Sequence, residues 1–369
     1  MRSETRTALE PVSWSDEHHV YVINGFEEAA KVLRGGAGWS NNPSSGGVNG
    51  MPPGLPRALV LMDPPDHTRV RSVLGPAFSA RAIERLRPRV IAIVNTVLDG
   101  LEDEDEVYIV ADFSRVVLVS IMAELFDVGV EDAEFIVGQI PPLLRWLEAD
   151  ATREDYQVSA EAAGKLTRFL TSLMDKRRLE PGSDFISALL ATGDELSIED
   201  IHGTCILVLA PVLDALVNII SNSTLAILRD PAQIPHLLAD PGRAAEELLR
   251  MEGTSKQLIR AAVTDHDLGP HRITKGQVVF VRVRDANRDP SRAPDAHRLD
   301  LSRPPLVHLT FGNGPHYCLG AGLTRLVMTE TLPRLFTRFP GLTLASREPV
   351  LRSSTSFHGL LELPVRLRG

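Results

Sequence analysis

The decapeptide Phe311–Gly320, Phe-Gly-Asn-Gly-Pro-His-Tyr-Cys-Leu-Gly, is the part of the chain whose residue types most clearly suggest chemistry. It places one cysteine, Cys318, in a glycine-rich loop directly before a helical pattern that starts near Ala321. The free N–H groups and the positive dipole end of a helix stabilise a thiolate, so we expect a lowered thiol pKa. We also expect Gly314 and Gly320 to let the backbone approach a flat, bulky group.

A thiolate held in this way is either a nucleophile or a metal ligand. A nucleophile needs a nearby base, and His316 is the candidate. A zinc site needs further sulfur or nitrogen ligands at short spacing, and the sequence around Cys318 has none. A single thiolate ligand suits haem iron.

The elements that must position this loop are mostly helical. Apolar residues at three-to-four spacing predict helices over 131–148, 159–178, 197–228 and 242–252. Short strand-like segments cover 19–23, 277–283 and 360–367. The segment from Ser197 to about Arg229 reads as one long helix, with Ser197 and Asp200 as its N-terminal capping signal. Pro211 inside it predicts a kink, or else two helices with a break at Ala210.

The composition excludes several classes of protein. Hydrophobic residues (43%) and charged residues (24%) are near the averages of soluble globular proteins, which argues against a disordered chain. With a net charge of −9, we expect no binding to nucleic acid or to an anionic membrane. The two cysteines, Cys205 and Cys318, cannot form a disulfide framework, and residues 1–24 lack the apolar core of a signal peptide. The longest apolar stretch, 205–220, is too short and too polar in its middle to span a bilayer, so we expect a soluble, cytoplasmic protein.

The decapeptide resembles the haem-binding signature of the cytochrome P450 family: Phe, two residues, Gly, one residue, His or Arg, one residue, Cys, one residue, Gly. This resemblance implies a single domain over residues 1–369, mostly α with small β-sheets. Haem b would be buried between the long distal helix, about 197–229, and the proximal loop 311–320. Cys318 would be the axial ligand of the haem iron, and Phe311 and Gly312 would belong to the haem-binding loop.

Three further motifs follow the family's order. One of them, Ala286-Asn-Arg-Asp-Pro290, supports the alignment and carries no chemistry. Glu247-Leu-Leu-Arg250, together with Arg303, resembles the structural triad of the family, which supports the proximal side of the fold.

The third motif contains His67 and Arg71, which are four residues apart and therefore share a helix face. They match the family's pair that binds the haem propionates, and Arg260 and His316 match the other propionate partners.

The distal helix departs from the family pattern. The usual sequence, Ala/Gly-Gly-x-Asp/Glu-Thr, is replaced by the segment Pro211-Val-Leu-Asp-Ala215. The acid is kept as Asp214, which we expect to act as a proton relay or as a salt-bridge residue. Ala215 stands at the position of the usual threonine and has no hydroxyl to donate a proton. Val212 adds bulk, and Pro211 offers another way to kink the helix.

Three interpretations of this departure stay open. A substrate hydroxyl or a bound water replaces the threonine, which leaves an ordinary monooxygenase. Alternatively, the enzyme carries out an unusual oxidation, such as coupling, cyclisation, desaturation or peroxide-driven chemistry. In the third interpretation, dioxygen activation is lost.

The resemblance also places a substrate pocket on the distal side. It would be bordered by a mobile Gly/Pro-rich flap over 41–56, a lid over 140–150 with the following turn through Tyr156, and a C-terminal hairpin over 353–357. The side chains expected to line it are Pro211, Val212, Ala215, Trp146, Leu258, Ile259 and Phe357. These residues suggest a medium-sized lipophilic substrate with some polar groups, either free or tethered to a carrier protein.

We therefore expect a haem-thiolate monooxygenase that uses dioxygen in the oxidative tailoring of a natural-product intermediate. Electrons would come from separate proteins, a ferredoxin and a ferredoxin reductase. Two alternatives remain: a P450-like protein that serves as a non-oxidising partner, and a haem enzyme that does not use dioxygen, such as a peroxygenase or an isomerase. The sequence does not define the substrate, the native redox partner or the oligomeric state.

Overall fold

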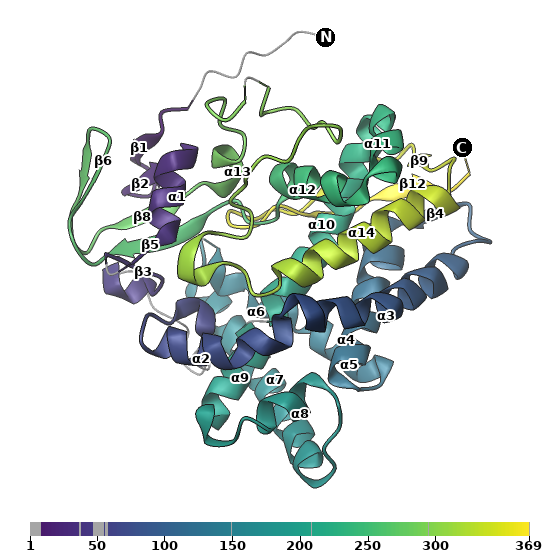
Figure 1. Cartoon of the computed structure of the whole chain (residues 1–369), viewed down its shortest axis with the longest axis horizontal. Helices are drawn as coiled ribbons and strands as arrows, with labels where there is room; N and C mark the ends of the chain where they lie inside the picture. Colours follow the sequence, from purple (N-terminus) through teal and green to yellow (C-terminus); the bar gives the residue numbers. More distant parts are fainter. Residues whose placement is uncertain are drawn as a thin grey trace.

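The structure is a computed structural model that describes residues 9–36, 38–46, 55, 58–148, 150–207, 209–293 and 295–368. For residues 43, 207 and 209–213 it describes the backbone only. A five-stranded sheet lies at one end of the molecule and a small three-stranded sheet at the other, with helices between and below them (Figure 1). The prediction of a mostly helical fold with small sheets is confirmed.

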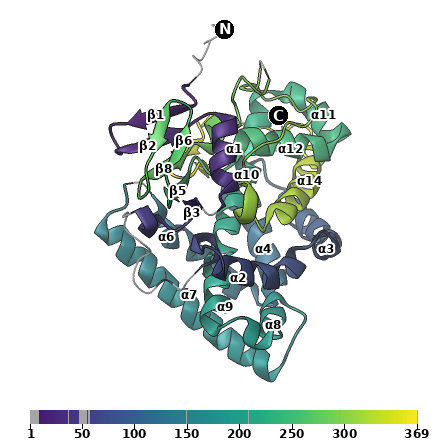
Figure 2. The ribbon, with the colours of Figure 1, turned by 60° about the vertical axis from the view of Figure 1, so that its left-hand side comes forward.

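The helices are α1 (Phe26–Arg34), α2 (Asp66–Leu74), α3 (Ala80–Asp99), α4 (Arg115–Phe126), α5 (Val130–Gly138), α6 (Ile140–Leu143), α7 (Arg153–Leu179), α8 (Phe185–Leu190), α9 (Ile198–Leu207), α10 (Leu209–Arg229), α11 (Ile234–Ala239), α12 (Pro241–Glu252), α13 (Val283–Ala286) and α14 (Ala321–Arg338). A π-helical segment, Ile109–Ser114, precedes α4, and a 3₁₀ turn, Arg145–Leu147, follows α6. The long helix α7 runs along the lower edge of the molecule (Figure 2).

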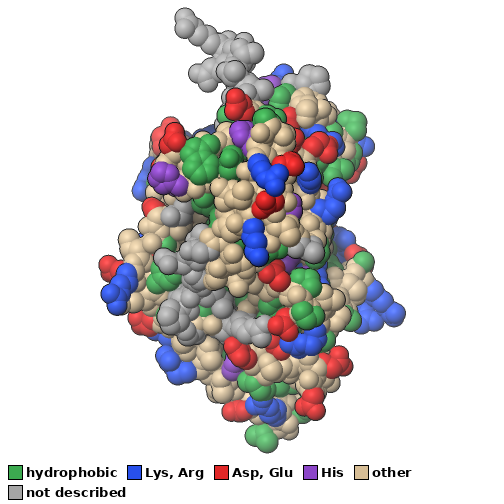
Figure 3. All heavy atoms as spheres, turned by 90° about the vertical axis from the view of Figure 1, so that its left-hand side faces the viewer, with side chains coloured by type: hydrophobic (Ala, Val, Ile, Leu, Met, Phe, Trp, Pro, Cys, Tyr) green, Lys and Arg blue, Asp and Glu red, His purple; other side chains and the backbone are tan. Residues whose placement is uncertain are grey.

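The strands are β1 (Val12–Ser15), β2 (Val20–Ile23), β3 (Trp39–Ser40), β4 (Glu106–Tyr108), β5 (Leu258–Ala262), β6 (His266–Leu268), β7 (His271–Ile273), β8 (Val278–Val281), β9 (Thr343–Leu344), β10 (Val350–Leu351), β11 (Leu360–Glu362) and β12 (Pro364–Arg366). In the larger sheet the order is β1-β2-β8-β5-β3. Only the β2–β8 pair is parallel among its described pairings. Figure 3 shows acidic and basic side chains interspersed over the face that carries this sheet.

Helix α10 lies at the centre and packs against α4, α6, α12 and α14. Its C-terminal half is buried on most sides, although it carries the polar run Ser-Asn-Ser-Thr at positions 221–224 among its apolar residues. The side chains of Ser221, Asn222 and Thr224 find partners inside the protein, whereas the buried hydroxyl of Ser223 has none among the described residues. The Ser221 hydroxyl lies 2.9 Å from the Ser114 hydroxyl and donates to the Val217 carbonyl at 2.8 Å.

Several predicted elements are found with changed limits. The helix predicted over 131–148 is divided into α5, α6 and the 3₁₀ turn, because Pro141 and Pro142 cannot continue a regular helix from the preceding turn. The segment predicted over 159–178 starts earlier, at Arg153, where Thr152 and Asp155 form a capping box. The expected long distal helix corresponds to α9 and α10, and residue 208 between them lies outside the described residues.

The predicted strands are found in shortened form as β2, β8, β11 and β12. Most of the expected flap over 41–56 lies outside the described residues. Among the described helices, none combines the length and the hydropathy that a membrane crossing requires.

Candidate functional site

The loop that carries Cys318 is closed by its own backbone. The Cys318 N–H donates to the Phe311 carbonyl at 2.8 Å, and the Asn313 side chain accepts from the Gly314 N–H at 2.9 Å. Asn313 also donates to the Ala30 carbonyl of α1 at 3.1 Å, which ties the loop to that helix. The loop is therefore fixed before α14 begins.

The expected reason for Gly314 needs correction. Its φ is +74°, and a Cβ at this position would lie 2.5 Å from the Arg34 carbonyl oxygen. Glycine is thus required here by the close approach of α1, not by a bulky ligand. Gly312 also has a positive φ, +73°, and it does line the cavity beside Cys318.

The thiol environment also differs from the expectation. Burial raises the pKa of Cys318, and this outweighs the N–H groups of Gly320 and Ala321 and the charges of Arg71 and Arg325, which lower it. The helix start contributes in the predicted direction, but desolvation of a thiolate in an apolar site is larger. A metal ion would reverse this balance, because a coordinating thiol is deprotonated outright.

Basic side chains gather next to Cys318. A cavity of about 250 Å³ is lined by Cys318, Arg71, Arg260 and His316. The rings of His67 and His316 lie 4.0 Å apart, so His67 stands directly behind this wall. Elements far apart in the sequence, α2, β5 and the 311–320 loop, therefore bring together the four residues predicted to bind propionates.

These basic groups are poorly neutralised. Arg260 is buried, and its hydrogen bond among the described residues goes to the neighbouring Ile259 carbonyl at 2.8 Å. Burial lowers the pKa of Arg260 to about 10. Burial and the nearby charges of His67, Arg260 and Arg71 lower the pKa of His316 to about 3.

The Nε2 atom of His67 is buried and has no hydrogen-bond partner in the part of the chain that the structure describes. A ligand with carboxylate groups would satisfy this atom and neutralise the arginines. Together with one thiolate donor, these residues fit haem b, whose propionates they would hold and whose iron Cys318 would bind.

Phe311 closes one side of the cavity. The guanidinium carbon of Arg325 lies 4.7 Å from the centre of its ring, and Arg325 pairs with Glu246 at 2.5 Å. This contact fixes the aromatic ring between the loop and α14.

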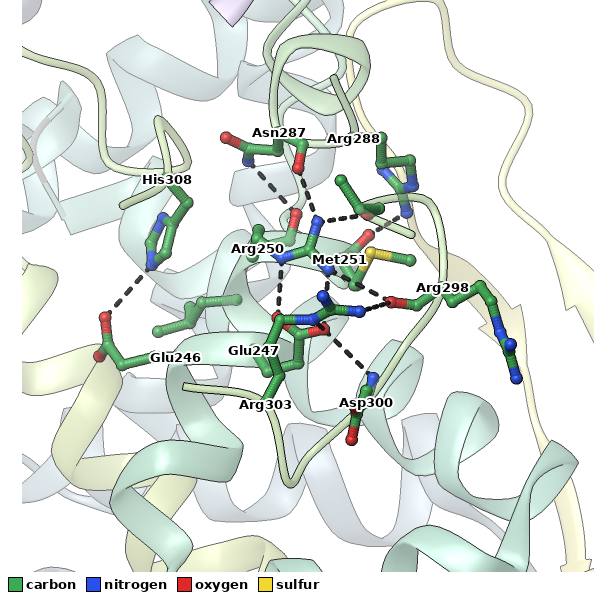
Figure 4. A network of polar contacts seen from close by, with 12 residues as sticks. Glu246, Glu247, Arg250, Met251, Asn287, Arg288, Arg298, Asp300, Arg303 and His308 are labelled. Carbon is green, nitrogen blue, oxygen red and sulfur yellow. Dashed lines mark hydrogen bonds and ion pairs between the residues drawn. The ribbon is translucent and has the colours of Figure 1, made fainter. Parts of the chain in front are cut away.

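The predicted triad forms a buried network on the proximal side (Figure 4). Glu247 accepts from Arg250 at 2.7 Å and from Arg303 at 3.3 Å. Arg250, which is 1% exposed, also donates to the carbonyls of Asn287, at 2.7 Å, and of Ala296. The network therefore anchors the segment 287–303, which leads to the cysteine loop.

The two faces of α10 have different surroundings. Ala215 and Ile219 line the cavity beside Cys318. Asp214 instead borders a second cavity of about 1080 Å³, together with Val217 and Asn218. The proton-relay interpretation requires the carboxylate of Asp214 to face the cysteine cavity. In the structure it borders the second cavity instead.

Asp214 forms the salt bridge that was the other expectation for it. One guanidinium nitrogen of Arg352 lies 3.0 Å from each of its carboxylate oxygens. Burial raises the pKa of Asp214, and Arg352 opposes this shift. The side chains of Pro211 and Val212 lie outside the described residues.

Other predicted pocket residues are divided between the cavity and the core. Leu258 lines the cysteine cavity, but Ile259 does not. Because successive side chains of a strand point to opposite faces, Ile259 packs with Val278 and Phe280 instead.

Trp146 is buried in the main core. Phe357 packs against Arg352, whose guanidinium carbon lies 5.4 Å from the centre of the ring. Neither residue lines the two cavities described above. Asn41, the first residue of the expected flap, does line the cysteine cavity. This cavity has further lining residues that the sequence did not single out: Leu59, Thr254, Ser255, Thr310 and Thr324.

Comparison with known proteins gives a consistent result. Residues 243–367 match the family model described as Cytochrome P450. The chain is 34% identical to the 6-deoxyerythronolide B hydroxylase of Saccharopolyspora erythraea over 83% of its length and 77% of that protein. It is 32% identical to the cytochrome P450 monooxygenase PikC of Streptomyces venezuelae, over 95% of this chain and 85% of that one.

A solved structure shows the same fold. The crystal structure of P450BioI in complex with an acyl carrier protein ligated to hexadec-9Z-enoic acid superposes with a TM-score of 0.90 and 29% sequence identity. The match covers 97% of this chain and 95% of that one.

Proposed function

The chain belongs to the cytochrome P450 family and is a P450 monooxygenase, and we propose that it oxidises a lipophilic intermediate of natural-product biosynthesis. The observation that carries the haem assignment is the convergence of Cys318 with Arg71, Arg260 and His316 on one cavity. When bound, haem b supplies the activation of dioxygen for insertion of an oxygen atom into the substrate.

Each residue has a separate role in this proposal. Cys318 binds the haem iron through its thiolate. Arg71 and Arg260 neutralise the propionates, and His67 and His316 donate hydrogen bonds to them. Because neutral imidazole carries one N–H group, His67 and His316 can act as donors without a positive charge.

The distal wall lacks its usual proton donors. Ala215 has no hydroxyl, and the carboxylate of Asp214 is held by Arg352 beside the other cavity. We propose that a hydroxyl group of the substrate, or a water held by it, supplies the proton at this wall. A substrate with polar groups next to the oxidised carbon fits this requirement.

The proposed substrate class rests on the relatives and on the apolar character of the cavity. The 6-deoxyerythronolide B hydroxylase and PksS, which is described as a polyketide biosynthesis cytochrome P450, are similar in sequence. P450BioI carries an acyl chain on a carrier protein in its solved structure. By analogy we propose a polyketide-like or acyl substrate, free or tethered to a carrier protein, with electrons from a ferredoxin and its reductase.

A second candidate reaction is peroxide-driven oxidation without dioxygen. The observation that favours it is again the cavity side of α10, where position 215 is an alanine and the carboxylate of Asp214 borders the other cavity. A non-oxidising partner protein fits less well, because such a protein needs neither Cys318 nor basic groups that face it.

The first experiment is an absorption spectrum of the purified protein, ferric and then reduced under carbon monoxide. A strongly red-shifted Soret band demonstrates haem bound through Cys318, and a protein that takes up no haem contradicts the proposal. Turnover is then compared with ferredoxin and reductase and with peroxide alone. Turnover only with the redox proteins supports the monooxygenase, and turnover on peroxide alone supports the second candidate.

A further inference from the structure

We now use the name lid for residues 140–148 and 150–158, which comprise α6, the 3₁₀ turn and the start of α7 and extend past the lid expected from the sequence. Polar contacts within the lid join these parts to one another. Arg145 pairs with Asp155 at 2.5 Å, and Thr152 and Asp155 cap α7. The Ser159 hydroxyl donates to the Pro142 carbonyl at 3.1 Å and accepts from the Trp146 N–H at 3.2 Å. These contacts hold the lid together, and the buried side chains of Leu143, Leu144 and Trp146 anchor it in the main core.

Within the described residues, the side-chain hydrogen bonds and ion pairs that leave the lid meet the C-terminal hairpin and, through Ser159, the rest of α7. A backbone bond from the Leu143 N–H to the Gln139 carbonyl, 3.1 Å, joins the lid to the end of α5. On the hairpin side, Glu148 accepts from the hydroxyl of Ser354 at 2.6 Å and from that of Thr355 at 2.9 Å. It also accepts from the N–H groups of Thr355, at 2.8 Å, and of Ser356, at 3.1 Å. The Ser356 hydroxyl donates to the Leu147 carbonyl at 2.6 Å. We call Glu148 together with residues 354–356 the latch.

The hairpin is in turn joined to the walls of the cysteine cavity. The Lys256 N–H donates to the Ser356 carbonyl at 2.9 Å, next to Thr254 and Ser255, which line that cavity. On the other side, Arg352 holds Asp214, the neighbour of the cavity residue Ala215. Arg352 also lies 4.0 Å from Glu148, so it links the lid with α10.

We propose that the latch sets the rate at which substrate enters and leaves the cavity, with Glu148 as a positioning residue for the lid. This inference rests on the proposed function, because it concerns the substrate of the same site. Releasing Glu148 removes the polar contacts between the lid and the hairpin but leaves the internal braces and the core packing of Leu143 and Trp146 in place, so it loosens the lid without detaching it. The donors of the latch are hydroxyl and N–H groups, which water can satisfy when the lid is open.

The test compares Glu148→Gln and Ser354→Ala with the wild-type holoenzyme. Glu148→Gln keeps the shape of the side chain but removes its charge and turns an NH₂ group toward donors. Ser354→Ala removes a donor without changing the glutamate. Glu134→Gln, on the exposed face of α5, is the matched control, since it removes a carboxylate that no described contact uses.

The measurement is stopped-flow binding of two haem ligands, imidazole and the bulkier 4-phenylimidazole. We expect Glu148→Gln to raise both the association and the dissociation rate of 4-phenylimidazole by about tenfold, with a smaller effect in Ser354→Ala and none in Glu134→Gln. Imidazole, which needs a smaller opening, should change by less than about threefold. Rates for 4-phenylimidazole that stay within about twofold of wild type would overturn the proposal.

Amide hydrogen exchange provides a readout that does not need bound haem. We expect faster exchange in residues 140–158 of Glu148→Gln and unchanged exchange in residues 160–179, the remainder of α7. Unchanged exchange in the lid contradicts the latch even if azole binding fails. A protein that binds no azole but shows the expected change in exchange contradicts the proposed function and leaves the latch supported.

Discussion

Two regions of this molecule are each held by a glutamate with several partners, and the two glutamates differ in the charge of those partners. Glu247 on the proximal side is 4% exposed and faces two arginines, Arg250 and Arg303, which are 1% and 9% exposed. Glu148 in the latch is 12% exposed, and its close partners are neutral hydroxyl and N–H groups. Removing an arginine from the first cluster leaves the buried charge of Glu247 with too few partners, whereas breaking the second leaves groups that water can reach.

This difference indicates that the proximal cluster belongs to a fixed part of the protein and the latch to a part that can move. The proximal cluster holds the chain that leads to Cys318, the residue that must keep one geometry. The latch holds a lid, for which reversible release is useful. The chemical nature of the partners, charged or neutral, therefore corresponds to the mechanical role of each region.

The largest expected effect comes from breaking the proximal cluster. We expect Arg250→Ala to lower the free energy of unfolding by about 3–5 kcal/mol, because it leaves Glu247 buried with one partner fewer. Chemical denaturation of the protein measures this. Arg272→Ala is the control: its partner Asp265 is 45% exposed, so we expect a loss of less than about 1 kcal/mol. Equal losses in the two variants would show that the cluster is no stronger than a surface pair.

The second-largest expected effect concerns Arg260 on β5 and the retention of haem. We expect Arg260→Gln to weaken haem retention by roughly ten- to a hundredfold, since a hydrogen bond to a charged group contributes about 1.5–3 kcal/mol. The rate of haem transfer to an excess of apomyoglobin measures this. Ile259→Val is the matched control on the opposite face of the same strand and should retain haem like wild type. If both variants lose haem equally, the effect of Arg260→Gln comes from disturbed packing of β5 and not from a lost contact with the haem.

The sequence allowed these two regions to be predicted to different extents. Cys318, its loop and the start of α14 are adjacent in the chain, so local spacing was sufficient to predict them. The positions of His67, Arg71 and Arg260 were predicted by family resemblance, because spacing alone cannot join α2 to β5.

The errors have a common physical cause, which is long-range packing. The reason for Gly314 depends on α1, nearly 280 positions away in the chain, and the thiol pKa depends on how deeply the whole fold buries Cys318. The latch was missed because it joins Glu148 to residues about 200 positions later. Its only signal in the sequence is the hydroxyl-rich run 353–356, Ser-Ser-Thr-Ser.

The third prediction concerns how the latch depends on pH, through the ionisation of Glu148. Burial alone would raise the pKa of Glu148, but hydrogen bonds from Ser354, Ser356 and Thr355 outweigh it and lower the pKa. A group whose pKa is lowered on folding stabilises the fold above its unfolded pKa, about 4.3 for Glu, and loses this effect as the pH falls through the folded pKa. We therefore expect lid exchange, corrected for intrinsic rates, to stay constant from about pH 8 to 5 and to rise below about pH 4.

Glu148→Gln is the control for this series, because it has no carboxyl group to titrate at that position. Its lid exchange should already be fast at pH 7 and should lack the rise at low pH. A rise of equal size in wild type and in Glu148→Gln would assign the acid effect to other carboxylates of the lid, such as Asp155.

The smallest expected effect is at the distal wall. Ala215→Thr places a hydroxyl on the face of α10 that lines the cysteine cavity, where the family usually has one. A proton donor at this position should raise the fraction of electrons that end in product, by about two- to fivefold, well below the 10²–10⁴ range of a full general acid. The measurement is the ratio of product formed to NAD(P)H consumed with ferredoxin and reductase, and Ala215→Val, which adds the same bulk without a hydroxyl, is the control. If threonine and valine change the ratio equally, the missing hydroxyl has no role, and α10 at this position only shapes the cavity.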